Sequence, residues 1–245
     1  MILITSPFEK LVFAMLLIGS VITCHALTHK LDSVVTYRFP STAGPIPRPS
    51  LSKETTREVE QLLSNLGYWT GPVDGVFDIA SRHALIAFQK AENRRVTGRL
   101  TLGELQSLRT AKRLLPQDSR FSHIEIDLTR QILFSVDETG LVSKILPVST
   151  GSDKLFTSEG RTRRAVTPCG RFTIIWKIPG WRKSPLGMLY YPNYVTGGVA
   201  IHGNPSVPFY PASHGCIRIP MFASKQFSEM NPIGTVVIIY NSDVD

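Results

Sequence analysis

The sequence predicts a multi-domain protein in which a small all-α module of three helices is followed by a mainly-β domain. In residues 54–112 the apolar side chains recur every three or four positions, which is the period of a helix that buries one face. In residues 121–241 they alternate with polar ones, in short β-branched runs separated by Gly and Pro, which is typical of strands. A chain of 245 residues is long enough for two such domains.

Residues 1–26 have the pattern of an export signal. A largely apolar run at residues 11–23 ends shortly before Ala26, a small residue suited to signal cleavage. A membrane-spanning helix needs about 20 residues, which is more than the run at residues 11–23 provides. A permanent membrane anchor is therefore the weaker interpretation. A lipid anchor on Cys24 is a further alternative, although Thr23 is bulkier than the residue that normally precedes a lipidated cysteine. We therefore expect an exported, extracytoplasmic protein whose signal peptide spans residues 1–26.

The chain is basic, with a formal net charge of +8. The positive charge gathers in residues 90–100, in residues 109–120 and in the segment RTRR at 161–164. Such patches attract polyanions. For an exported protein these are anionic wall polymers or lipid headgroups, and nucleic acid is not an expected partner.

Residues 27–53 separate the signal from the first folded module. They contain prolines at positions 40, 45, 47 and 49 and show no apolar period. Proline-rich segments of this kind adopt extended conformations. We expect a spacer that projects the following module away from the exported end.

Three helices are predicted after the spacer. The first begins with a capping box formed by Thr55 and Glu58, in which each residue satisfies a free backbone N–H of the other. The second covers residues 79–91, and the third begins with a second capping box, Thr101 and Glu104. The module carries no cluster of catalytic residue types, which favours a binding role.

The order of the segments in this module resembles the three-helix peptidoglycan-binding domain family. The shared features are a leucine-rich first helix, LGY at 66–68, DG at 74–75 followed by an aromatic residue, and AFQ at 87–89. The resemblance covers residues 54–112 and implies attachment to wall glycan. It identifies no binding residues, and His83, which lies among apolar neighbours, is interpreted as structural.

The second domain is predicted to be built from strands. Residues 123–137 alternate between apolar and polar side chains on both sides of a turn near Thr129. Further strand-like segments lie at 140–151, 170–178 and 234–241. The one clear helical stretch, residues 221–230, follows Pro220, which suits a helix start.

The segment SHGCIRIP at 213–220 is the candidate functional site. If it is extended, its period of two places Ile217 and Ile219 in the core and His214, Cys216 and Arg218 on the opposite face. The residues alone leave four roles open for Cys216: a nucleophile, a zinc ligand, half of a disulfide with Cys169, or a small buried hydrophobic residue.

His202, in GGVAIHGN, is predicted to face the same cleft. A thiol becomes reactive when a neighbouring base takes its proton, and His202 or His214 can do so while Arg218 stabilises the anion. The backbone N–H groups of Gly215 and Cys216 can then bind a developing oxyanion. The zinc alternative uses His202, His214 and Cys216.

The motif GVAIHGN followed by SHGCIR resembles the signature of the L,D-transpeptidase catalytic domain, supported by PVSTG (147–151), TPCGRF (167–172) and the terminal GTVVIIY. The resemblance covers residues 121–241. It implies a β-sandwich-like domain that needs no cofactor or metal. Its cysteine forms a thioester with a tetrapeptide stem, releases D-alanine and passes the acyl group to an amine, giving 3→3 cross-links in cell-wall biogenesis. Peptidoglycan stem peptides and glycan are the implied partners and carbapenem β-lactams the implied inhibitors.

The resemblance also implies a role for each matched residue. Cys216 is the nucleophile and His202 its general base. The supporting and oxyanion residues are His214, Gly215, Arg218, Gly203 and Ser213. One of Tyr190, Tyr191 and Tyr194 is expected to line the cleft.

Cys169 departs from the family pattern, which has a small residue without a thiol at this position. It is therefore expected near the cleft, where it would form a reversible bridge with Cys216. A zinc-dependent peptidoglycan peptidase and a catalytically inactive wall-binding protein are the alternative functions.

Overall fold

The computed structural model describes residues 51–242. The predicted signal peptide, the possible anchor at Cys24 and nearly all of the predicted spacer lie outside the described residues. The described chain begins with helices α1 (Lys53–Asn65), α2 (Ile79–Ala91) and α3 (Leu102–Thr110). None of the helices within these residues combines the length and the apolar character that crossing a membrane requires.

The first helix begins earlier than its sequence pattern predicted. Ser52, not Thr55, is the N-cap residue, and its side chain accepts a hydrogen bond from the Thr55 backbone N–H at 3.2 Å. Serine at this position satisfies one of the free N–H groups of the first turn. The predicted start of α3 is confirmed, because the Thr101 hydroxyl accepts a hydrogen bond from the Glu104 N–H.

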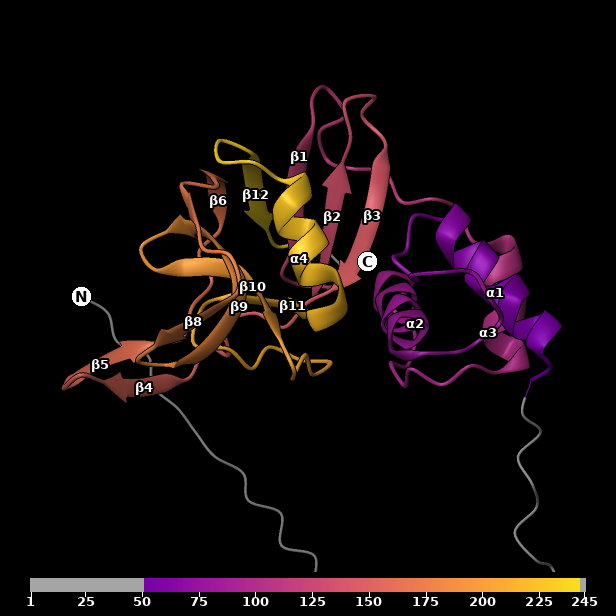
Figure 1. The fold of residues 1–245 in the computed structure, drawn as a ribbon, viewed down its shortest axis with the longest axis horizontal. Helices are drawn as coiled ribbons and strands as arrows, with labels where there is room; N and C mark the ends of the chain where they lie inside the picture. The colour runs from indigo at the N-terminus through magenta and orange to yellow at the C-terminus, as the bar shows by residue number, and fades with distance from the viewer. Residues whose placement is uncertain (1–50, 243–245) are drawn as a thin grey trace, which may run out of the picture. The chain divides into compact units, whose positions relative to one another are not determined.

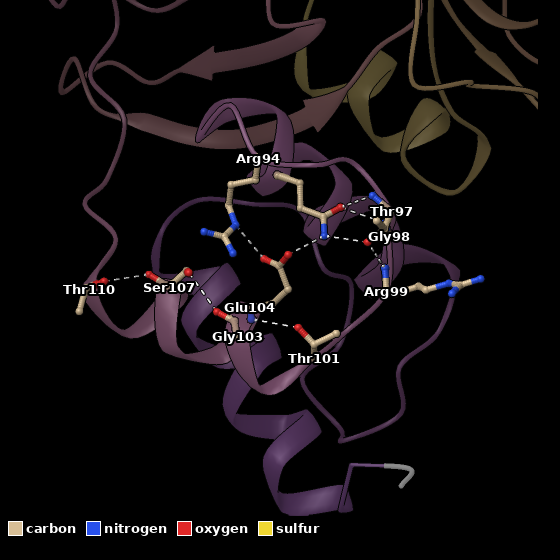
Figure 2. A network of polar contacts seen from close by, with 10 residues as sticks. Arg94, Thr97, Gly98, Arg99, Thr101, Gly103, Glu104, Ser107 and Thr110 are labelled. Atoms are coloured by element: carbon tan, nitrogen blue, oxygen red, sulfur yellow. Dashed lines mark hydrogen bonds and ion pairs between the residues drawn. The ribbon is translucent and has the colours of Figure 1, made fainter. Parts of the chain in front are cut away.

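A buried polar network joins α2 to α3 and to the loop between them (Figure 2). The Glu104 carboxylate accepts hydrogen bonds from the Gln89 amide at 3.0 Å and from Arg94 Nε at 3.2 Å. The other end of the Gln89 amide accepts the backbone N–H groups of Thr97 and Gly98, both at 2.9 Å. Glu104 therefore braces the loop instead of completing the capping box.

Two sheets form most of the second domain (Figure 1). The first has the order β3-β2-β1-β12-β6, with β1 His123–Asp127, β2 Ile132–Val136, β3 Val142–Pro147, β6 Gly170–Thr173 and β12 Val236–Tyr240. The second has the order β11-β10-β9-β7, with β7 Trp176–Lys177, β9 Gly187–Thr196, β10 Val199–Asn204 and β11 Ile217–Pro220, and β8 (Trp181–Ser184) also pairs with β9. The predicted combination of a helical module and a mainly-β domain is confirmed.

The core of this domain lies between the two sheets. Ile124 and Leu146 of the first sheet pack in one cluster with Ile201 and Ile217 of the second. Helix α4 (Met221–Met230) follows Pro220 as predicted, and its Phe227 completes the cluster. This packing holds β10 and β11 rigidly in place, which matters because both strands carry candidate site residues.

A short two-stranded sheet, β4 (Leu155–Ser158) and β5 (Arg161–Arg164), stands apart from both large sheets (Figure 1). The sequence pattern gives no indication of this hairpin. All four residues of β5 are exposed and three of them are arginines, so the segment lacks the buried alternate positions by which strands are recognised.

The helical module shares a core with the first sheet. Leu63, Leu85 and Phe88 from the helices pack in one cluster with Phe134 and Ile145 from β2 and β3. Polar contacts also join the two modules. The buried Lys90 ammonium donates hydrogen bonds to the carbonyls of Gln131, at 3.1 Å, and Val148, at 2.9 Å. Apolar packing and these hydrogen bonds therefore attach the helical module to the first sheet.

Candidate active site

The candidate site lies where β10 and β11 run side by side. The two strands are parallel, with Ile201 opposite Ile217 and His202 opposite Arg218. Both isoleucines are fully buried in the core. Because side chains alternate along a strand, His202 and Arg218 lie together on the other face, as the sequence period predicted.

The residues on this face open into a cleft of about 530 Å³. Its lining includes His202, Ser213, His214, Gly215, Cys216 and Arg218. All of the predicted site residues except Gly203 therefore reach one cavity. The walls come from the β4–β5 hairpin, through Phe156, Arg163 and Arg164, and from the β8–β9 hairpin, through Arg182, Leu186, Met188 and Leu189.

His202 is buried and oriented by its neighbour in sequence. Its Nδ1 lies 2.9 Å from the Gly203 carbonyl oxygen. A carbonyl only accepts, so Nδ1 carries the proton and Nε2 is left as a base. Burial lowers the pKa of His202 to about 4, against the opposing effect of the Gly203 hydrogen bond, and the Arg218 charge lowers it further. The ring is therefore neutral at pH 7.

Gly203 is required by close packing on the reverse side of β10. A Cβ at this position would lie 2.1 Å from Ser224 Oγ in α4 and 3.1 Å from the Tyr190 ring. Any side chain would displace β10 from α4. Gly203 thus contributes its carbonyl to His202 and its small size to the strand.

Cys216 lies just before β11, with its thiol 3.7 Å from the Gly198 carbonyl oxygen. Burial raises the pKa of this thiol, while a hydrogen bond from the Ala200 backbone and the Arg218 charge act in the opposite direction. Arg218 favours the thiolate, as the sequence predicts, but burial outweighs that effect. The resting site therefore holds a neutral thiol and a neutral imidazole.

The turn before Cys216 is closed by Ser213. Its hydroxyl donates to the Cys216 carbonyl at 2.5 Å and accepts the Gly215 N–H at 3.0 Å. The Gly215 N–H, one of the two backbone donors expected to serve an oxyanion, is therefore already engaged in this turn. Gly215 has a φ of +129° and a Cβ there would lie 2.9 Å from the Val166 carbonyl oxygen, so only glycine fits the turn.

Two threonines, for which the sequence predicted no role, hold this turn in place by hydrogen bonds. The Thr167 hydroxyl donates to the Gly215 carbonyl at 2.7 Å and accepts the Gly151 N–H at 2.9 Å. The Thr150 carbonyl accepts the N–H groups of Ala212 and Ser213. Both threonines lie in segments quoted as motifs, PVSTG and TPCGRF, but their spacing from Cys216 gave no sign of contact.

Two of the remaining predictions can be placed. His214 lines the cleft, and its ring packs edge-on against Phe156 of β4, with ring centres 4.8 Å apart. Of the three candidate tyrosines only Tyr194 lines the cleft. Tyr190 lies on the other face of β9, beside Gly203.

The predicted bridge between Cys169 and Cys216 is not formed in this structure. Cys169 is exposed, does not line the cleft, and accepts a hydrogen bond from the Asn241 amide at 3.4 Å. It directly precedes β6, an edge strand of the first sheet, whereas Cys216 directly precedes β11 of the second sheet. Both thiols are free.

The alternative zinc site requires His202, His214 and Cys216 to converge on one point. Within residues 51–242 no three His, Cys, Asp or Glu side chains are grouped so as to hold a metal ion. His202, His214 and Cys216 share a cleft but do not form such a group.

Comparison with known proteins gives matches for both modules. Residues 122–239 match the L,D-transpeptidase catalytic domain and residues 52–108 a putative peptidoglycan binding domain. An L,D-transpeptidase from Xylanimonas cellulosilytica has 36% identity and a TM-score of 0.71 over 76% of this chain and 92% of that one. One from Stackebrandtia nassauensis has 22% identity and a TM-score of 0.46, over 77% and 92%. None of the curated proteins matches the chain.

The two matched modules define a peptidoglycan transpeptidase that carries its own peptidoglycan-binding domain. More specifically, the chain belongs to the L,D-transpeptidase family, because it is 36% identical to a solved member and covers nearly all of it.

Proposed function

We propose that the protein is an exported cysteine L,D-transpeptidase that makes 3→3 cross-links in peptidoglycan. The observation that carries the proposal is the tautomer of His202. Its Nδ1–H donates to Gly203, so that Nε2 is an acceptor in the cleft that also holds Cys216. A positioned base beside a thiol is the arrangement that nucleophilic catalysis needs.

In the first half-reaction His202 Nε2 takes the thiol proton while Cys216 Sγ attacks the carbonyl carbon of the third stem residue. The Cys216 N–H and the Arg218 guanidinium stabilise the oxyanion, since donors aimed at developing charge lower the barrier. The C–N bond to the terminal D-alanine then breaks, and His202 returns the proton to the departing amine. A thioester on Cys216 remains.

In the second half-reaction an amine of a neighbouring stem attacks the thioester. His202 accepts the proton of the amine, the C–S bond breaks, and the thiolate takes that proton back. The product is a new amide between two third residues, and the enzyme is regenerated without an external oxidant or reductant.

The charge of the cleft supports an anionic substrate. Arg163, Arg182 and Arg218 line it against one carboxylate, Glu159, and Arg164 beside them pairs with Asp153 at 2.7 Å. A stem peptide carries free carboxylates, and basic walls raise the local concentration of such a ligand. The same excess of positive charge supports contact with anionic wall polymers.

The decisive experiment is mass spectrometry of the protein after incubation with a carbapenem and, separately, with a disaccharide-tetrapeptide. We expect one covalent adduct with the carbapenem, loss of D-alanine from the tetrapeptide, and neither event in Cys216→Ala. Unmodified wild-type protein with both compounds, or activity that chelators abolish, would contradict the cysteine mechanism. Export is tested separately by the N-terminal sequence of the mature protein, which we expect to begin after Ala26.

A further inference from the structure

An exposed tryptophan lies beside a residue that lines the cleft. Trp176 of β7 is 51% exposed to solvent. Its ring stacks on that of Tyr194, with ring centres 5.0 Å apart and planes inclined by 19°. Large exposed apolar surface beside a cleft commonly marks a ligand-binding surface.

The register of the second sheet places this pair on the catalytic face. Trp176 is opposite Tyr194, and Tyr194 is opposite Ala200 of β10, two residues before His202. Cross-strand partners share a face of a sheet. Tyr194 lines the cleft, and Trp176, which does not itself line it, continues the same face through its stacking on Tyr194.

A second tryptophan provides an internal comparison. Trp181 of β8 is 50% exposed and packs on Tyr190 with ring centres 4.8 Å apart. Tyr190 lies against the Gly203 and Ser224 side of β10, which is the reverse face. Neither Trp181 nor Tyr190 lines the cleft. The two tryptophans are thus equally exposed to solvent, but the Trp176–Tyr194 pair lies on the face of the sheet that carries the cleft and the Trp181–Tyr190 pair on the reverse face.

We propose that the Trp176–Tyr194 pair is a glycan subsite, which binds a sugar ring of the substrate while the attached stem peptide occupies the cleft. The proposal rests on the proposed function. Stem peptides consist of small and charged residues, which offer no flat surface to two stacked rings. A pyranose ring offers a flat face of C–H groups to an aromatic face, and the stack fixes the indole in advance, so that little side-chain entropy is lost on binding.

The test compares two donors that differ only in the sugar, a free tetrapeptide and the same tetrapeptide on its disaccharide. For Trp176→Ala we expect kcat/KM to fall about three- to tenfold with the disaccharide donor, the range of one aromatic contact. The free tetrapeptide should react at the wild-type rate. Trp181→Ala should match wild type with both donors, and Trp176→Tyr should restore most of the loss.

An equal fall with both donors, or no fall with the disaccharide donor, would overturn the glycan subsite and leave the transpeptidase function intact. If wild type turns over neither donor, the proposed function fails and the subsite is still tested by binding. Calorimetric titration with the disaccharide-tetrapeptide should then show weaker binding to the double variant Cys216→Ser, Trp176→Ala than to the single variant Cys216→Ser. Equal affinity in the two proteins would refute the subsite.

Discussion

Glu60 in the helical module and His202 in the cleft are both buried, yet they differ in how many of their polar atoms form hydrogen bonds. The Glu60 carboxylate accepts hydrogen bonds from the Asp74 and Gly75 N–H groups and from the Ser81 hydroxyl. His202 donates one hydrogen bond, to Gly203, and its second nitrogen has no such partner assigned. A buried group whose polar atoms all form hydrogen bonds stabilises the fold. A buried group with an atom that forms none can use that atom in a reaction.

The largest effect is expected at His202. His202→Ala should slow acylation of Cys216 by about 10²- to 10⁴-fold, because a positioned general base contributes that much. The measurement is the second-order rate of carbapenem adduct formation at pH 7. His214→Ala, on the same cleft, should lose much less, and a larger loss for His214→Ala would show that the two histidines have the opposite roles.

The next effect concerns the core that the two modules share. Phe88 is buried and packs edge-on against Tyr68, with ring centres 5.7 Å apart. Phe88→Ala should lower the free energy of unfolding by about 3–5 kcal/mol. Because its cluster includes Phe134 and Ile145 of the β domain, both modules should unfold in one shifted transition.

Calorimetry distinguishes this result from independent domains. Val76→Ala, at a residue 56% exposed, is the control and should change stability by less than about 0.5 kcal/mol. Two separate transitions, with only the helical one shifted in Phe88→Ala, would contradict the shared core.

A further effect is a pH dependence of stability at Lys90. Burial lowers the pKa of this ammonium to about 7 from 10.5. The folded state therefore binds fewer protons than the unfolded state between these values, so this residue should make stability increase as pH rises from about 7 to 10.5. Lys90→Met removes the titrating group and should flatten this part of the profile of unfolding free energy against pH. An unchanged slope would show that Lys90 titrates normally.

The sequence alone predicted the parts of the site that depend on strand periodicity. The burial of Ile217 and Ile219, and the shared face of His202 and Arg218, follow from alternation. The helix over residues 79–91 was likewise given by a strong apolar period. Patterns of this kind depend only on residues that are close together in the sequence.

Features that depend on distant contacts could not be predicted. The hydrogen bond from Thr167 to Gly215 joins segments 48 residues apart. The position of Cys169 depends on which sheet β6 joins, and the role of Lys90 on the packing of α2 against β3. The N-cap at Ser52 was missed for a local reason, since Thr55 three residues later offers a similar capping pattern.

The core shared by the helices and the first sheet bears on where this enzyme can act. A wall-binding module on a flexible linker lets its catalytic partner reach stems over a range of distances, with an effective concentration that depends on linker length. Here apolar packing and Lys90 replace such a linker between the module and strand β3. We expect the spacing between the anchoring point on the wall and the bond that Cys216 attacks to be constant, so that the enzyme favours stems at one offset along the glycan.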